Sequence, residues 1–92
     1  MAYDPFPMAT ASPTPTPNPN AMKYTLDVKL PATINFPNAE AAADNAFAAA
    51  VFAGGGVGSL FGVNDFVTVT RLPGADWGAI TTTVQAAAAE HL

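Results

Sequence analysis

This 92-residue sequence contains no cysteine, and Lys23, Lys29 and Arg71 are its only lysine and arginine residues. Without thiols the chain forms no disulfide and offers no thiolate ligand to a zinc ion or an iron–sulfur cluster. The formal net charge of −4 leaves no basic stripe to neutralise the phosphates of a nucleic acid. We therefore expect no nucleic-acid binding.

Long apolar runs are also missing. Glycine, asparagine, aspartate or proline interrupts each hydrophobic stretch well before the ~18 residues that a membrane span needs. The N-terminal segment has no cationic start ahead of an apolar run and no arginine, so it predicts neither a secretory signal nor a mitochondrial presequence. The sequence thus predicts no membrane association and a cytoplasmic location.

Proline dominates the beginning of the chain. Residues 1–15 combine it with alanine, serine and threonine and show no hydrophobic periodicity. Each proline removes an amide donor and disfavours helix at the residue before it. We therefore predict a flexible tail over residues 1–15 and one folded domain over residues 16–92.

Two alternating segments predict a first pair of strands. From Met22 to Leu30, apolar side chains at every second position alternate with polar ones, which indicates a half-buried strand. After Pro31, a shorter alternation from Ala32 to Phe36 indicates a second strand. The short connection between the two segments predicts a hairpin.

A helix is predicted to follow these strands. Asn38 is placed to accept a free amide hydrogen of the first helical turn and thus to cap the helix. Phe47 and Val51 then recur at helical spacing on one face. The three glycines at 54–56 end the helix, because glycine readily adopts the left-handed conformation.

The remaining sequence predicts a second hairpin and a second helix. The β-prone segments 57–63 and 66–72 are joined by Asn64-Asp65, a pair that tolerates the positive φ angles of tight turns. Asp76 is a good cap for a helix that begins near Trp77 and carries an apolar stripe. The complete order of elements predicts a single-domain α+β fold with an antiparallel four-stranded sheet and both helices packed on one face.

Four segments of the sequence together resemble one known family. They are Thr16-Pro17-Asn18-Pro19-Asn20-Ala21-Met22-Lys23-Tyr24, Ala39-Glu40-Ala41-Ala42-Ala43, Asp65-Phe66-Val67-Thr68-Val69-Thr70 and Gly74-Ala75-Asp76-Trp77. The combination and its order are similar to the N-terminal domain of Nfu/NifU-type iron–sulfur scaffold proteins. The resemblance covers residues 16–92.

The resemblance implies a connection with iron–sulfur cluster assembly. In that family, a second domain with a Cys-x-x-Cys pair usually assembles and delivers the cluster. This sequence contains no such pair. The resemblance therefore implies contacts with protein partners of the pathway and an accessory or regulatory role, rather than scaffold activity.

Candidate partner-binding residues lie in the opening motif and at the start of the last helix. Pro17-Asn18-Pro19-Asn20 can present a rigid knuckle, although turn chemistry alone also explains these residue types. Lys23 is the cation of the same motif. Trp77 is either a recognition anchor or, as its place on an apolar stripe favours, a core residue whose indole N–H has a local acceptor.

The sequence predicts neither an enzyme nor a cofactor site. With no cysteine and with His91 as the only histidine, the usual nucleophile–base pairs are hard to assemble. An alternative hypothesis is weak binding of ferrous iron by carboxylates and His91. Glu90 is adjacent to His91, but neighbouring residues of a helix do not face each other. We therefore expect a non-catalytic interaction module without a metal site.

Overall fold

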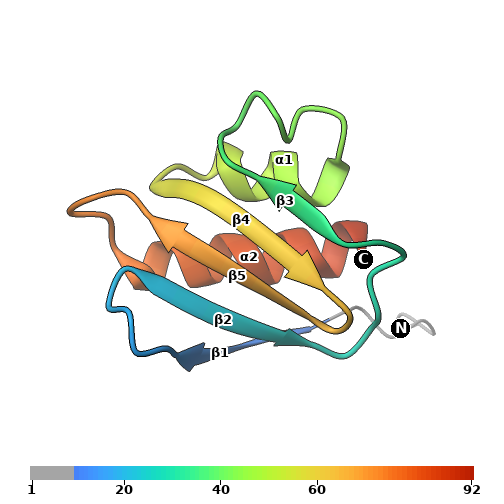
Figure 1. Ribbon diagram of the computed structural model, residues 1–92, viewed down its shortest axis with the longest axis horizontal. Helices are drawn as coiled ribbons and strands as arrows, with labels where there is room; N and C mark the ends of the chain where they lie inside the picture. The colour runs from blue at the N-terminus through green and yellow to red at the C-terminus, as the bar shows by residue number, and fades with distance from the viewer. Residues whose placement is uncertain (1–9) are drawn as a thin grey trace, which may run out of the picture.

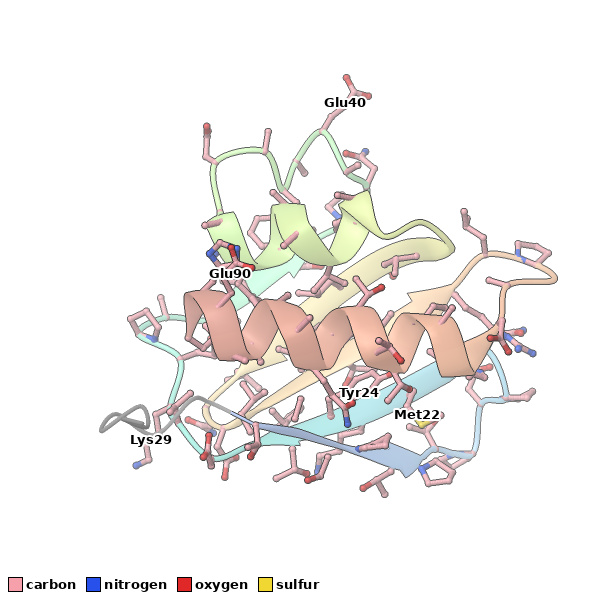
Figure 2. All side chains as sticks on the ribbon, turned by 180° about the vertical axis from the view of Figure 1, so that it is seen from behind. Met22, Tyr24, Lys29, Glu40 and Glu90 are labelled. Atoms are coloured by element: carbon pink, nitrogen blue, oxygen red, sulfur yellow. The ribbon has the colours of Figure 1, made fainter. Side chains whose placement is uncertain are left out.

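The computed structural model describes residues 10–92, so most of the predicted tail lies outside the described part of the chain. The elements are β1 (Ala11–Pro15), β2 (Ala21–Leu26), β3 (Ile34–Phe36), α1 (Ala46–Ala53), β4 (Val57–Val63), β5 (Phe66–Arg71) and α2 (Trp77–His91). The strands form one antiparallel sheet in the order β1-β2-β5-β4-β3. Both helices lie on one face of this sheet (Figure 1, Figure 2). The α+β class and the antiparallel sheet are thus confirmed.

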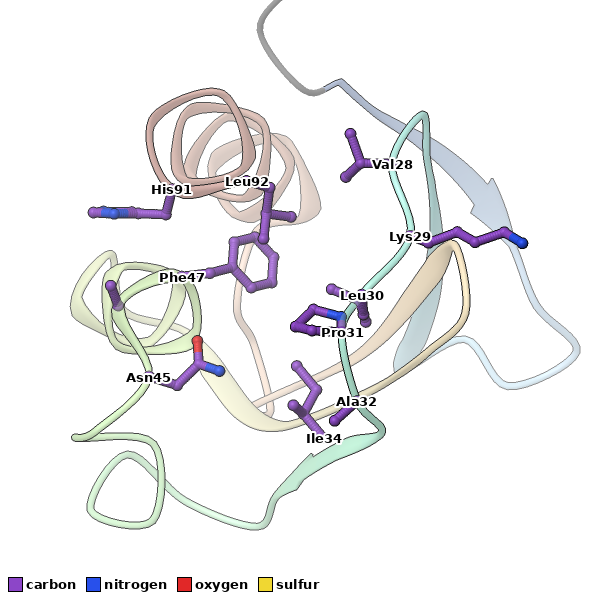
Figure 3. Close-up of a pocket in the computed structure, with 11 residues that line it drawn as sticks. Val28, Lys29, Leu30, Pro31, Ala32, Ile34, Asn45, Phe47, His91 and Leu92 are labelled. Atoms are coloured by element: carbon purple, nitrogen blue, oxygen red, sulfur yellow. The ribbon is translucent and has the colours of Figure 1, made fainter.

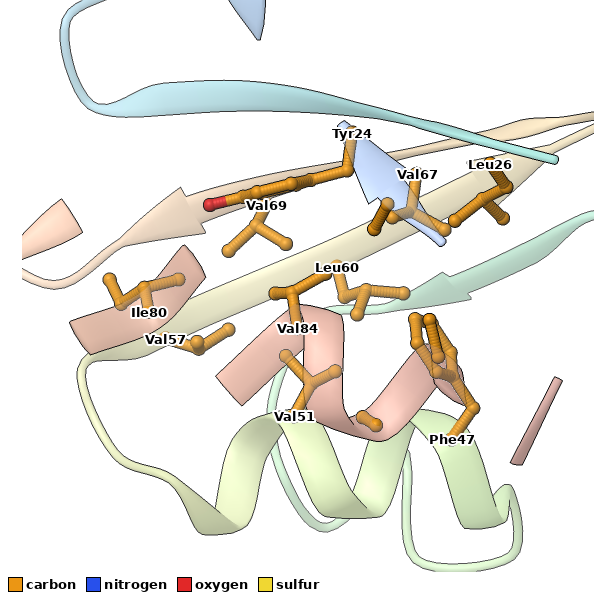
Figure 4. Packing of buried hydrophobic residues seen from close by; sticks show 13 residues of the cluster. Tyr24, Leu26, Phe47, Val51, Val57, Leu60, Val67, Val69, Ile80 and Val84 are labelled. Carbon is orange, nitrogen blue, oxygen red and sulfur yellow. The ribbon is translucent and has the colours of Figure 1, made fainter. Parts of the chain in front are cut away.

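The hydrophobic core lies between the two helices and the inner face of the sheet. Alternation along the central strands β2 and β5 points Tyr24 and Val67 inward, and β4 adds Leu60. Val51 of α1 and Val84 of α2 pack against these side chains (Figure 4). All five side chains are fully buried. No helix of residues 10–92 covers the opposite face of the sheet, which we call the open face (Figure 1).

The prediction of four strands is wrong, because the sheet has five. The additional strand, β1, is Ala11–Pro15, which lies within the segment predicted to be a flexible tail. It pairs with β2 alone, with Ala11 opposite Leu26 and Pro15 opposite Met22. A strand at the edge of a sheet needs hydrogen bonds on one side only, so it accommodates the prolines that argued against a strand.

The expected hairpin between the first two predicted strands is also wrong. The strand β3 pairs with β4 at the far edge of the sheet, while β2 pairs with β5. The chain between β2 and β3 passes around the β4–β5 turn, where the amides of Leu26 and Leu30 each donate to backbone carbonyls of that turn at 2.6 Å. The position beside β2 is occupied by β5, whose Val67 and Val69 are fully buried.

The first helix begins later than expected, and Asn38 does not cap it. Asn45 is the N-cap of α1, and its Oδ1 accepts from the Ala48 amide at 2.9 Å. Asn38 instead accepts from the Ala41 amide at 2.8 Å and stabilises a turn of the preceding loop. Both asparagines satisfy the same capping chemistry, so the local pattern did not distinguish them.

The second half of the chain folds as predicted. The strands β4 and β5 form a hairpin around Asn64-Asp65, and Asn64 adopts a φ of 55°. The helix α2 begins at Trp77, directly after its cap Asp76, whose Oδ2 accepts from the Ala79 amide at 3.0 Å. No helix in residues 10–92 is long and apolar enough to cross a membrane.

Candidate partner-binding site

The connection between β1 and β2 is a tight turn held by its own side chains. The Asn20 amide donates to Asn18 Oδ1 at 2.9 Å, and the Asn18 amide donates to Thr16 Oγ1 at 3.2 Å. Pro17 and Pro19 restrict φ between these hydrogen-bonded positions. The residues from Pro17 to Asn20 are all exposed. The turn is therefore both fixed in shape and accessible to a partner.

Arg71, the last residue of β5, joins this turn to the loop before α2. Its backbone amide donates to the Asn20 carbonyl at 2.8 Å, and its Nε donates to Asn20 Oδ1 at 3.2 Å. Its Nη1 donates to the Ala75 carbonyl at 3.0 Å. One side chain thus connects two loops that are far apart in the sequence and lie at the same end of the sheet (Figure 1).

Trp77 completes the contact between the two loops. Its indole Nε1 donates to the Pro19 carbonyl at 3.2 Å, and its ring centroid lies 5.5 Å from the guanidinium carbon of Arg71. The side chain is half-buried and packs against the edge of the core. The local acceptor agrees with the core alternative, whereas the partial exposure leaves part of the ring accessible. We call the group Pro17–Asn20, Arg71, Ala75 and Trp77 the corner.

The structure separates Lys23 from the corner. Lys23 is exposed on β2, and its side chain extends over the open face, where its Nζ lies 4.5 Å from the ring centroid of Phe66. The neighbouring strand positions on this face carry Thr68 and Phe61, opposite one another in the β4–β5 register. The predicted candidates therefore fall on two surfaces, the corner and the open face.

Arg71 is the corner residue that sequence reasoning missed. In the sequence it is one of three cations, at the end of a predicted strand and with no charged residue beside it. Its role depends on Asn20, 51 positions away, and on the ring of Trp77. The sequence shows only that a single arginine precedes the Gly74-Ala75-Asp76-Trp77 segment. That position does not indicate that Arg71 contacts Asn20.

Tyr24 is the one described residue with a resolved pKa shift, and it lies inside the core rather than at a surface site. Burial raises the pKa of its phenol above the usual value of 10.0. A hydrogen bond between its hydroxyl and Thr81 Oγ1, at 2.9 Å, opposes that rise. The pair connects β2 to α2, so we assign it a structural role.

A hollow with a volume of about 420 Å³ lies at the opposite end of the molecule from the corner. Its walls come from the loop after β2, the start of α1 and the end of α2, with Leu30, Phe47 and Leu92 around the space (Figure 3). Its side chains are mostly apolar, and Asn45 Oδ1 is already engaged as the α1 cap. The other polar side chains of the lining, Lys29 and His91, extend away from the space (Figure 3). The lining therefore does not direct several polar groups toward one point in the hollow.

The described residues do not form a metal site. No group of at least three histidine, cysteine, aspartate or glutamate residues between positions 10 and 92 is placed to hold an ion. His91 Nε2 lies 3.9 Å from Glu90 Oε1, and both side chains are near the end of α2. The ligand set of the iron-binding hypothesis is thus not assembled in this part of the chain.

Comparison with solved structures shows related folds. Protein SAV1430 from Staphylococcus aureus is 28% identical in its crystal structure, with a TM-score of 0.72, and the alignment covers 85% of this chain and 96% of that one. The solution structure of a NifU-like protein from Saccharomyces cerevisiae is 21% identical, with a TM-score of 0.78 and coverage of 98% and 83%. At this identity, the yeast protein supports the fold alone. No curated protein matches the chain with significant similarity.

A family comparison covers nearly the whole described domain. The family described as "Scaffold protein Nfu/NifU N terminal" matches residues 12–92, from within β1 to the last residue. The match includes the turn, β5 and the start of α2, which together build the corner. The resemblance inferred from the four sequence segments is thereby confirmed, and the chain belongs to the Nfu/NifU N-terminal family.

Proposed function

We propose that this chain is a non-catalytic interaction module that works beside iron–sulfur cluster carriers and contacts them through the corner. Membership of the Nfu/NifU N-terminal family connects it with cluster assembly. The sequence itself contains no cysteine to ligate a cluster. In this proposal the cluster is cargo held by a partner protein, and the module acts through its surface.

The observation that carries the proposal is the construction of the corner. An exposed Pro-Asn-Pro-Asn turn is fixed by Arg71 and Trp77, so its shape exists before a partner arrives. A preformed surface loses less conformational entropy on binding than a loop that must first become ordered. Tryptophan and arginine are also the residue types that most often dominate binding energy at protein interfaces.

Iron binding by carboxylates and His91 is the less favoured alternative, because no group of at least three such ligands converges within residues 10–92. The absence of catalysis remains part of the proposal and rests on the family and on the apolar lining of the hollow. The cytoplasmic location remains a prediction from the sequence.

The test is an NMR titration of the isotope-labelled protein with a separate Cys-x-x-Cys carrier and with a cysteine desulfurase. We expect one of them to shift resonances of the corner, including the indole N–H of Trp77. Asn20→Ala should weaken this binding, because it removes the Oδ1 that holds Arg71. Asn35→Ala is the matched control, since Asn35 is exposed on the distant strand β3. Binding to neither protein would contradict the proposal.

A further inference from the structure

The guanidinium of Arg71 is held in place through two of its three nitrogens. Asn20 Oδ1 engages Nε, the Ala75 carbonyl engages Nη1, and the Trp77 ring lies beside the guanidinium. No acceptor for Nη2 lies among residues 10–92. Arginine presents its donors as a rigid planar fork, so fixing two of its nitrogens also fixes the direction of the third.

Within residues 10–92, no carboxylate forms an ion pair with Arg71. The ion pair found in that range joins His91 to Glu90. Asp76 lies between the corner residues Ala75 and Trp77 in the sequence. Its carboxylate caps α2, because Oδ2 accepts from the Ala79 amide. The chain has a net charge of −4, yet this cation has no anionic partner in the described structure.

The oxygens that accept hydrogen bonds from the Arg71 side chain belong to an amide and a backbone carbonyl, so both are neutral. A carboxylate can accept two parallel hydrogen bonds from a guanidinium, and these charge-assisted bonds are stronger than those to carbonyl groups. Holding the side chain in advance lowers the entropy lost when the anion binds. The half-buried setting of Arg71 beside Trp77 also lowers solvent screening.

We infer that Arg71 is a preformed receptor for a carboxylate, and that the partner of the corner presents an acidic side chain there. Apolar atoms next to that carboxylate would contact the accessible part of the Trp77 ring. The partner chemistry is thus an acidic protein segment with an apolar neighbour, rather than a basic or purely apolar one. This inference rests on the proposed function, because it names the chemistry recognised by the same surface.

The test uses two synthetic peptides of equal length. In one, glutamate alternates with leucine, and in the other glutamine replaces each glutamate. NMR titration of the whole protein follows the Arg71 Nε–H and the Trp77 indole N–H, which report directly on the corner. We expect the glutamate peptide to shift both resonances and to bind at least about tenfold more tightly than the glutamine peptide.

Two substitutions distinguish the contribution of the planar guanidinium of Arg71 from the contribution of its positive charge. Arg71→Gln should weaken binding of the glutamate peptide about tenfold, whereas Arg71→Lys should weaken it about fivefold, because lysine keeps the charge without the planar fork. Lys29→Gln is the matched control: it removes the same charge at the opposite end of the molecule and should change binding less than about twofold. Thermal unfolding and amide spectra establish that each variant is folded.

The outcomes distinguish this inference from the proposed function. Equal binding of both peptides, no binding of either, or equal weakening by Arg71→Gln and Lys29→Gln would overturn the carboxylate receptor. Carrier binding that Arg71→Gln leaves unchanged would overturn it too, while the interaction module would stand. Selective binding of the glutamate peptide without binding of any carrier or desulfurase would support the receptor and contradict the proposed function.

Discussion

The two faces of the sheet use the same strands but have different surroundings. On β4, Leu60 points to the inner face and is fully buried, whereas its neighbour Phe61 points to the open face and is 40% exposed. On β2, Tyr24 is fully buried beneath the helices and Lys23 is exposed. The difference indicates that the inner face contributes most of the stability, so side chains on the open face can change at little cost to folding.

The largest effect is expected for Leu60→Ala. This substitution leaves a cavity in the middle of the core, between the sheet and both helices (Figure 4). We expect it to lower the free energy of unfolding by about 2–5 kcal/mol, measured by urea denaturation. Phe61→Ala removes a larger side chain from the adjacent position and should cost less than about 1.5 kcal/mol, since much of that ring is already in water. Equal losses would break the distinction between the faces.

The next effect concerns Gly62, which is buried on the inner side of the same strand. A Cβ at this position would lie 2.7 Å from Leu30 Cδ1 and 2.9 Å from Ile34 Cγ1. Val67 Cγ1 of β5 would lie at 2.9 Å as well. Gly62→Ala should therefore overpack the contacts of β4 with Leu30, β3 and β5 and cost about 1–3 kcal/mol of unfolding free energy. Ser59→Ala, toward the open face of β4, is the control and should stay within about 0.5 kcal/mol.

A smaller effect is expected for Tyr24→Phe, which removes the hydrogen bond to Thr81 and should cost about 1 kcal/mol. Because burial raises the folded-state pKa of Tyr24, the folded protein keeps this proton at a pH where the unfolded chain loses it. The stability from this group is thus complete below about pH 10 and declines as pH rises further. Melting curves between about pH 9 and 11 should show a smaller decline for Tyr24→Phe than for the wild type. Parallel declines would show that Tyr24 does not cause the effect.

The smallest effect is expected on the open face itself. Lys23→Gln removes the cation that lies over the Phe66 ring, an exposed contact worth about 0.5 kcal/mol. Thermal unfolding should hardly change, and the small difference should remain at high salt if packing of the aliphatic stem contributes most of it. A loss comparable to that of Leu60→Ala would mean that the open face also supports the fold.

Local patterns predicted the parts of the fold whose partners are near in sequence. The Asn64-Asp65 turn and the Asp76 cap depend on a few adjacent residues, and both formed as expected. The alternation around Tyr24 also identified the inner side of β2 correctly. These features need only the chemistry of neighbouring positions, so the sequence contains the required information.

The errors concern contacts between distant segments. The pairing of β3 with β4 depends on where the chain crosses the β4–β5 turn, and no local pattern specifies that path. The strand Ala11–Pro15 forms because β2 offers an edge, whereas its own composition argues against it. The corner shows the same limit, since the Pro-Asn-Pro-Asn turn was recognisable but its attachment to Arg71 was not.

The prolines of β1 also affect how this protein behaves at high concentration. Pro13 and Pro15 lie in the outermost strand at one side of the sheet, where they remove amide donors that another chain would need for pairing. Any growth of the sheet into intermolecular assemblies would thus be disfavoured at this side. On the other side, β3 offers three residues, a short template that gives little support for fibril growth.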